Sequence, residues 1–195
     1  MFDLGQVLFL FDWQPALEIV SRHSPLDADT IRKVVVGHEK HRGFELGLTT
    51  EAEFFAWLRT ELRVDAQAPS LEHLWNGIFQ PQKENLEIFE RVRRTHRVAI
   101  VSNTNPAHAR HLETICPALL KCDRRFYSFE VGLRKPDPAI FRMALEAMGA
   151  RPGHTLFVDD LEENVRAADA IGIQTIHFTG HRSLLEDFRK RGLLE

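Results

Sequence analysis

Polar side chains that can hold a cation or a phosphate group follow short apolar runs at three points of the chain. Asp3 is the first, Ser102 and Asn103 come next, and Asp159 with Asp160 forms the third. Ligands of open parallel sheets bind beyond the carboxyl ends of the strands, so we expect these side chains to converge. Carboxylates brought so close repel one another unless a cation lies between them, and oxygen ligands favour a hard ion such as Mg²⁺.

Lys135 adds a positive charge to this set. Two prolines directly follow it in the segment Lys135-Pro136-Asp137-Pro138, and they restrict the loop so that we expect its ammonium to reach the same place. Carboxylates, Mg²⁺, a hydroxyl and an ammonium suit phosphoryl transfer, because the charge on the transferred group needs cations and donors around it. A carboxylate can serve as the nucleophile. Asp3 is the candidate, since it stands alone at its strand end with flexible Gly5 beyond.

The second half of the chain alternates short β-branched runs with amphipathic stretches, which is typical of βαβ units. Strands that are apolar throughout are buried on both faces, so the pattern predicts an α/β fold with a doubly wound, Rossmann-like parallel sheet. The predicted strands are 98–101, 155–158 and 175–178, with a weaker candidate at 126–129. The predicted helices are 106–115, 138–148, 162–171 and 183–191.

The first half, from about residue 14 to 95, shows helical periodicity and almost no strand signal. Thr50 opens a capping box, Ser70 begins another helix, and Asp27 or Asp29 begins an earlier one. We interpret the histidine-containing segment 38–41 as a polar turn and expect the ten histidines to lie at the surface. Only residues 1–11 remain as a possible strand, although a parallel crossover needs only about a dozen residues. The surplus predicts an inserted α-helical cap.

Composition excludes several classes of function. The 25 basic and 28 acidic residues leave a net charge of -3 and no basic excess for nucleic acid. No apolar run approaches the roughly 18 residues of a membrane span. The two cysteines do not form a disulfide framework or a zinc site, which favours reduced thiols. We therefore expect a cytoplasmic protein without nucleic-acid or membrane partners.

Four segments of the chain resemble the motifs of the haloacid dehalogenase-like hydrolase superfamily, in the same order. They are Phe2–Val7, Val98–Asn103, Arg134–Phe141 and Leu156–Asp160 with Asn164 following. With the helices between them, the resemblance covers essentially the whole chain. Within the superfamily the chain is similar to small phosphatases with a helical cap after the first motif, a group that includes a bacterial alpha-D-glucose-1-phosphate phosphatase.

The resemblance implies a role for each residue at a motif position. Asp3 would be the nucleophile, Ser102 would donate to a phosphoryl oxygen with Asn103 beside it, and Lys135 would steady both Asp3 and the phosphate.

The resemblance also implies the ligands of the Mg²⁺ ion. They would be Asp3, the backbone carbonyl of Gly5, and Asp160 directly, with Asp159 acting through a water or sharing that role.

These assignments together predict an enzyme with two structural units. Residues 1–13 and 86–195 would form the α/β core, and residues 14–85 the cap that closes over the site. The predicted reaction is Mg²⁺-dependent hydrolysis of a small phosphorylated metabolite, a phosphomonoester that we expect to be a sugar phosphate, through an aspartyl-phosphate on Asp3.

Two departures from the superfamily pattern leave alternatives open. Gly5 stands where the fuller motif has a second Asp that acts as general acid and base. Only two residues precede Asp3, whereas a central strand of about five residues should lead into it, so we expect the natural start codon to lie upstream. The alternatives are a metal-independent 2-haloacid dehalogenase, a catalytically weak or inactive relative that binds a partner, and, less in keeping with the late acid pair, a receiver domain.

Overall fold

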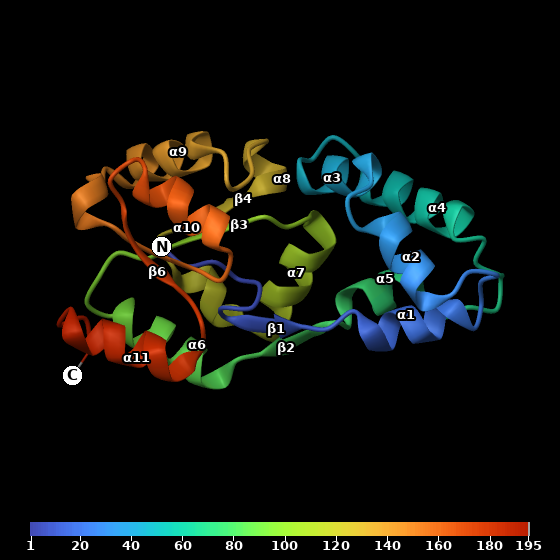
Figure 1. Cartoon of the computed structure of the whole chain (residues 1–195), viewed down its shortest axis with the longest axis horizontal. Coiled ribbons are helices and arrows are strands. Elements are labelled where there is room, and N and C mark those ends of the chain that lie inside the picture. Colours follow the sequence, from blue (N-terminus) through green and yellow to red (C-terminus); the bar gives the residue numbers. More distant parts are fainter. Residues whose placement is uncertain (195) are drawn as a thin grey trace.

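Phe2 joins two pairs of parallel strands into one sheet in the computed structural model, which describes residues 1–194 (Figure 1). β3 (Ala99–Ser102) pairs with β4 (Arg124–Tyr127), and β5 (Leu156–Asp159) pairs with β6 (Gln174–His177). Phe2 forms parallel bridges to one residue of β3 and to one of β5. The strand order is therefore β4, β3, the Phe2 segment, β5 and β6, and the predicted doubly wound parallel sheet is confirmed.

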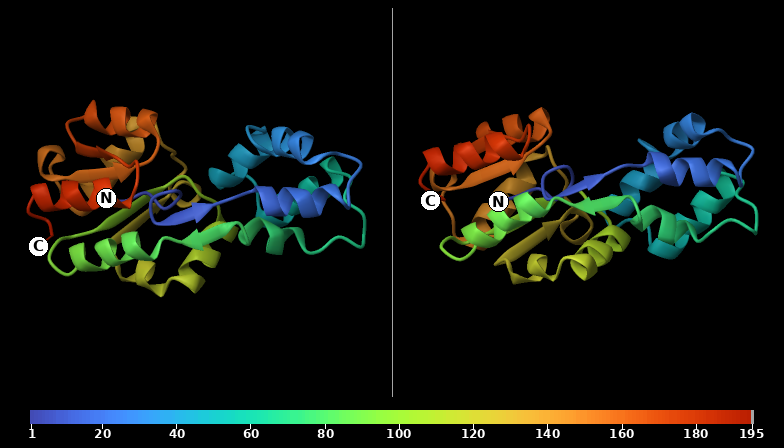
Figure 2. Two further views of the ribbon diagram at one scale, coloured as in Figure 1. Left: turned by 60° about the horizontal axis from the view of Figure 1, so that its bottom comes forward. Right: turned by 90° about the horizontal axis from the view of Figure 1, so that it is seen from below.

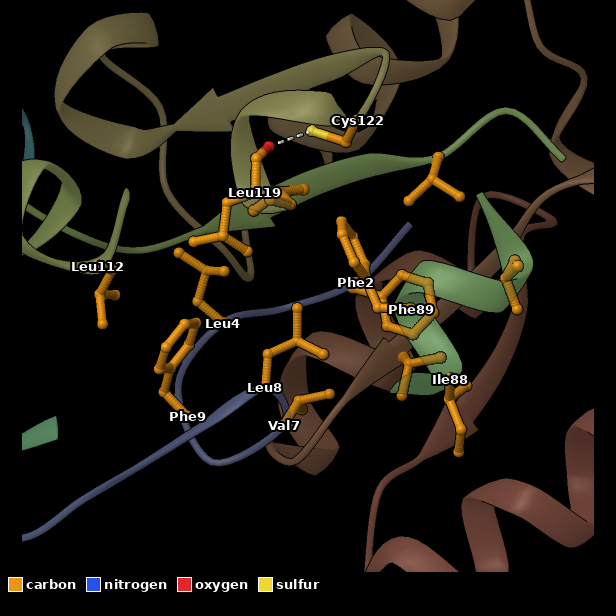
Figure 3. Close-up of a cluster of buried hydrophobic side chains, with 14 of the residues drawn as sticks. Phe2, Leu4, Val7, Leu8, Phe9, Ile88, Phe89, Leu112, Leu119 and Cys122 are labelled. Atoms are coloured by element: carbon orange, nitrogen blue, oxygen red, sulfur yellow. Dashed lines mark hydrogen bonds between the residues drawn. The ribbon is translucent and has the colours of Figure 1, made fainter. Parts of the chain in front are cut away.

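Helices cover both faces of this sheet (Figure 2). On one face, α6 (Lys83–Val92), α7 (Pro106–Ile115) and α11 (His181–Lys190) bury apolar side chains in the cluster drawn in Figure 3. On the other face, α9 (Pro138–Met148) and α10 (Glu162–Asp169) bury a second cluster. Burial on both faces explains why these strands are apolar throughout. No helix within residues 1–194 has the length and apolar character to cross a membrane.

Three short helical elements connect the strands and longer helices. They are α8 (Ser128–Val131) and the 3-10 helices η1 (Pro117–Lys121) and η2 (Pro152–His154). The strand predicted at 126–129 begins two residues earlier as β4, and its last two predicted residues already belong to α8. Helix and strand propensities are too similar over four residues to place that boundary.

The possible strand within residues 1–11 is present as two short pieces, the Phe2 segment and β1. After the Phe2 bridge the chain turns at Gln6, whose φ is 55°. β1 (Phe9–Phe11) then pairs antiparallel with β2 (Phe79–Pro81) outside the main sheet. The sequence does not predict a strand at 79–81, because a three-residue strand that ends in proline depends on its distant partner and leaves no local pattern.

The β1–β2 ribbon leads to a separate group of helices, which we call the helical unit. Its members are α1 (Gln14–Ser21), α2 (Ala28–Val35), α3 (Glu39–Glu45), α4 (Glu51–Glu61) and α5 (Leu71–Asn76). These helices bury their own apolar cluster and lie beyond one end of the sheet (Figure 1). The helical insertion predicted from the sequence is therefore present.

The helix starts of this unit follow local side-chain chemistry. Asp27 and Ser70 accept backbone N–H groups of their first turns, and Thr50 forms the predicted capping box with Glu53. The polar turn expected at 38–41 is wrong, because His38 caps α3 by accepting the Lys40 N–H at 3.0 Å. A histidine is an unusual cap, so the start of this helix was not recognised.

His108 connects the helical unit to α7. Its Nε2 lies 3.0 Å from the Trp75 carbonyl oxygen, and its ring stacks on the Trp75 indole with 5.0 Å between centroids. Its Nδ1 lies 3.0 Å from the Asn105 amide nitrogen, so a neutral ring that donates from Nε2 satisfies both contacts. His108 is buried, which corrects the expectation that every histidine lies at the surface.

His108 makes the fold sensitive to acid. Burial lowers the pKa of His108 from 6.5 to about 3. Its contribution to stability is therefore complete above pH 6.5 and is lost as the pH falls toward 3, because the unfolded chain binds the proton more readily. Each pH unit in that window should cost about 1.4 kcal/mol. We expect the unfolding free energy of His108→Gln, measured by urea titration, to fall less between pH 7.5 and pH 5.0 than that of the wild type. Parallel pH curves for the two proteins would contradict a neutral buried His108.

A cavity of about 220 Å³ lies beside Met1, between β3 and β5. Val98 and Ala99 line one side and Leu156 the other, with residues of the covering helices around them. The Met1 amino group donates to the Leu156 carbonyl at 2.6 Å, and burial lowers the pKa of that amine to about 5. Alternate residues of a strand direct their N–H groups to opposite sides, so those of Ala99 and Leu156 point toward this cavity. A strand added beside Met1 would pair with these edges of β3 and β5.

An added strand should fill this cavity. We expect the extension Thr-Val-Ile-Val ahead of Met1 to raise the melting temperature by several degrees, because buried aliphatic side chains each contribute about 1.5–3 kcal/mol. An extension Gly-Ser-Gly-Ser of equal length is the matched control. Scanning calorimetry and amide exchange at Ala99 and Leu156 measure the effect, and equal melting temperatures for the two extensions would count against it.

Candidate active site

Three carboxylates meet at the carboxyl edge of the sheet. Asp3 follows the Phe2 bridge, Asp159 ends β5, and Asp160 is the next residue. One carboxylate oxygen from each lies within 4.8 Å of the others. The structure therefore brings together the acidic residues that the sequence analysis placed at two different strand ends.

Lys135 bridges two of these carboxylates. Its Nζ lies 2.8 Å from Asp3 Oδ1 and 2.6 Å from Asp159 Oδ2, and the residue is only 2% exposed. Burial by itself lowers the pKa of this ammonium, but the two carboxylates outweigh that effect and raise it above its usual value. The lysine is therefore held charged between Asp3 and Asp159.

Asp3 keeps one of its oxygens free. Oδ1 accepts the Leu4 N–H at 2.7 Å and is the oxygen nearest Lys135, whereas Oδ2 makes no hydrogen bond with any residue that the structure describes. Burial raises the pKa of Asp3 to about 6, although Lys135 opposes the shift, and the charge of Asp159 adds to it. An oriented carboxylate with one free oxygen is the arrangement that a nucleophile requires.

Asp159 and Asp160 differ in the hydrogen bonds of their carboxylates. Asp159 is fully buried; its Oδ1 accepts the Leu161 N–H and the Asn164 side-chain amide, both at 2.9 Å. Its other oxygen faces Lys135. The Asp160 carboxylate makes no hydrogen bond with the described residues, and burial followed by the charge of Asp159 raises its pKa. Asp159 is thus fixed in place, while Asp160 is available to a ligand.

This donor set fits a divalent cation. Three carboxylates face one ammonium, so two negative charges remain in a place where burial raises the pKa of Asp3 and Asp160. Carboxylate oxygens are ligands that Mg²⁺ prefers. The Gly5 carbonyl accepts the Val7 N–H at 2.7 Å and keeps a second lone pair, so its role as a ligand stays a prediction.

The side chains of Ser102 and Asn103, at the end of β3, differ in their hydrogen bonds. Ser102 is nearly buried, and its hydroxyl has no hydrogen-bond partner among residues 1–194. The Asn103 side chain instead donates to the Lys135 carbonyl at 2.9 Å and accepts the Lys135 N–H at 2.8 Å. Asn103 therefore acts on the site through the backbone of Lys135, and its contact with substrate stays a prediction.

Asn164 is a site residue to which the sequence analysis assigned no role. Its amide donates to Asp159 from the first turns of α10, and its own Oδ1 is buried without a partner in the described chain. The sequence spacing could have indicated this contact, because the loop after β5 turns into α10 and brings residue 164 back beside Asp159.

The Phe11 ring lies where a side chain at residue 5 would begin. A Cβ atom at Gly5 would lie 3.1 Å from Cε1 of the Phe11 ring. A carboxylate at this position therefore requires the ring to move. At the position where this chain departs from the superfamily motif, the Phe11 ring thus occupies space that an aspartate side chain would need.

The charge balance of the site gives a prediction for Lys135→Met. Removing the ammonium leaves two buried carboxylates without their partner, and breaking a buried ion pair typically costs about 3–5 kcal/mol. In urea unfolding experiments we expect the free energy of unfolding of Lys135→Met to fall by that order in EDTA. Mg²⁺ should restore part of it. Arg166→Met is the control, because the Arg166–Glu162 pair lies at the surface and should matter little. Equal losses for the two variants would contradict the bridging role.

Comparisons with known proteins agree with this geometry. A profile described as haloacid dehalogenase-like hydrolase matches residues 29–172. A D-ribitol-5-phosphate phosphatase of Bacteroides thetaiotaomicron is 25% identical over 90% of this chain and 88% of that protein. A sesquiterpene phosphatase of Aspergillus oryzae is 26% identical over 97% of this chain and 94% of that protein.

A solved structure supports the fold. A haloacid dehalogenase family enzyme of Bacteroides thetaiotaomicron, in complex with magnesium and inorganic phosphate, superposes with a TM-score of 0.80. It is 26% identical in sequence, and the match covers 90% of each chain.

Proposed function

This chain belongs to the haloacid dehalogenase-like hydrolase family, and we propose that it is a Mg²⁺-dependent phosphatase of a small phosphorylated metabolite. The observation that carries the proposal is the buried Lys135 ammonium, which orients Asp3 while leaving Asp3 Oδ2 free. The phosphatases among its relatives, and the magnesium and phosphate bound by a structural neighbour, support it.

In the proposed reaction Asp3 Oδ2 attacks phosphorus, the bond from phosphorus to the ester oxygen breaks, and an aspartyl-phosphate forms. The ester oxygen leaves as the alcohol after it takes a proton from water. Lys135 and the Ser102 hydroxyl would donate to phosphoryl oxygens. Asp3 and Asp160, with Asp159, would hold Mg²⁺, which would supply positive charge to the transferred group. Attack of water on phosphorus then releases inorganic phosphate and restores the Asp3 carboxylate.

The proposed division of the chain assigns catalysis and substrate choice to different parts. Residues 1–13 and 86–195 would form the catalytic core, and residues 14–85 the cap over it. A sugar phosphate as substrate is supported by the relative named for D-ribitol 5-phosphate. The Aspergillus relative is named for a sesquiterpene, so a substrate panel has to include both sugar and isoprenoid phosphates.

Hydrolysis of p-nitrophenyl phosphate tests the function. We expect turnover that requires Mg²⁺ and stops in EDTA. Asp3→Asn should lower kcat by at least about 10³-fold, because it removes the nucleophile and keeps the shape. Asp169→Asn, an exposed change at the end of α10, is the control and should leave kcat unchanged.

Two results would contradict the proposal. Release of chloride from 2-chloropropionate that survives EDTA would identify a dehalogenase. No turnover of p-nitrophenyl phosphate or of the substrate panel with Mg²⁺ would identify an inactive relative.

A further inference from the structure

Ser128 binds the backbone of the loop that follows β3. Its hydroxyl accepts the Thr104 N–H at 2.9 Å and donates to the Thr104 carbonyl at 3.0 Å. Ser128 is fully buried and Thr104 nearly so. One hydroxyl thus satisfies both backbone hydrogen-bonding groups of a residue that water does not reach.

The position of Ser128 follows from the parallel sheet. Ser102 is paired with Tyr127 at the carboxyl ends of β3 and β4, so Ser128 stands opposite the start of the loop. The loop that follows Ser102 and the Lys135 loop both lie at this edge. The contact therefore joins the ends of two strands that are far apart in the sequence.

The residues on either side of Thr104 are also held by side chains. Asn103 bonds the backbone of Lys135 through its amide, as described above. Asn105 caps α7 by accepting the His108 N–H at 3.0 Å. Of Ser102 and Asn103, the two side chains considered for phosphate, Ser102 is the one whose polar group lacks a partner within the described chain, and the Thr104 hydroxyl beside them also has none.

We propose that Ser128 is a positioning residue, which fixes the Thr104 peptide and through it holds the Ser102 hydroxyl in place for a phosphate oxygen. The proposal rests on the proposed phosphatase function, because it names a residue that serves the same site. Without the hydroxyl, the N–H and carbonyl of Thr104 lose their partners, and the two peptide groups that flank Thr104 rotate toward other partners. Ser102, two residues before Thr104 at the end of β3, then moves from its place.

Loss of the Ser128 hydroxyl should weaken the binding of phosphate. Ser128→Ala should raise the KM for p-nitrophenyl phosphate and the Ki of inorganic phosphate by about tenfold, the size of one lost hydrogen bond. Ser128→Cys fills nearly the same space with a weak hydrogen-bonding group and should behave alike. This second variant keeps the test valid if the alanine variant does not fold.

Ser24 offers a matched control. Its hydroxyl also binds one backbone carbonyl and one backbone N–H, those of Leu62 and Leu26, at a partly buried place in the helical unit. Ser24→Ala should lower the melting temperature and leave the Ki of phosphate unchanged. A general loss of stability would instead move both variants together.

A double-mutant cycle with Ser102→Ala separates positioning from a merely structural role. If Ser128 acts through Ser102, its removal should raise the Ki of phosphate about tenfold in the wild-type background and less than twofold in the Ser102→Ala background. An equal effect in both backgrounds, or no effect in the wild type, would overturn the proposal.

The two proposals fail in different ways. Absence of phosphatase turnover contradicts the proposed function, but binding of inorganic phosphate with Mg²⁺, measured by calorimetry, still tests Ser128. Equal phosphate affinity of the wild type, Ser128→Ala and Ser128→Cys would overturn the role of Ser128 and leave the phosphatase function standing.

Discussion

The ion bridge from Lys135 to Asp3 and Asp159 is the interaction on which the rest of the site depends. A buried ammonium is stable only beside compensating charge, and two carboxylates brought together need a cation between them. Each partner therefore requires the others. The bridge turns Oδ1 of Asp3 toward the lysine and leaves Oδ2 free, so the same contact that stabilises the site also orients its proposed nucleophile.

Around this bridge, side chains hold backbone groups as well as one another. Asn103 binds both backbone groups of Lys135, Ser128 binds both of Thr104, and a backbone N–H and the Asn164 amide hold one oxygen of Asp159. Such contacts let loops keep a fixed shape without regular secondary structure, because buried N–H and carbonyl groups find partners. A preorganised site of this kind does not have to rearrange when charge develops in the reaction.

The centre of the sheet is its least complete part. Residues 1–3 join the two strand pairs, because Phe2 bonds the backbone of β3 while Met1 and Asp3 bond that of β5, and a cavity lies beside Met1. The proposed nucleophile is the last residue of this thin junction. Its position depends on the backbone bonds of Phe2 and Asp3 to both neighbouring strands and on the apolar cluster below them (Figure 3).

The sequence by itself determined the parallel α/β sheet, the helical insertion and the acidic strand ends, because these depend on local apolar patterns, caps and the residues that follow each strand. Pro106–Ile115 and the Thr50 capping box are where the local signals placed them. Only the tertiary structure decided the β1–β2 ribbon, the buried His108, and which of Asp159 and Asp160 keeps a free carboxylate. These features arise from contacts between residues distant in the chain, and such contacts leave no periodic trace in the sequence.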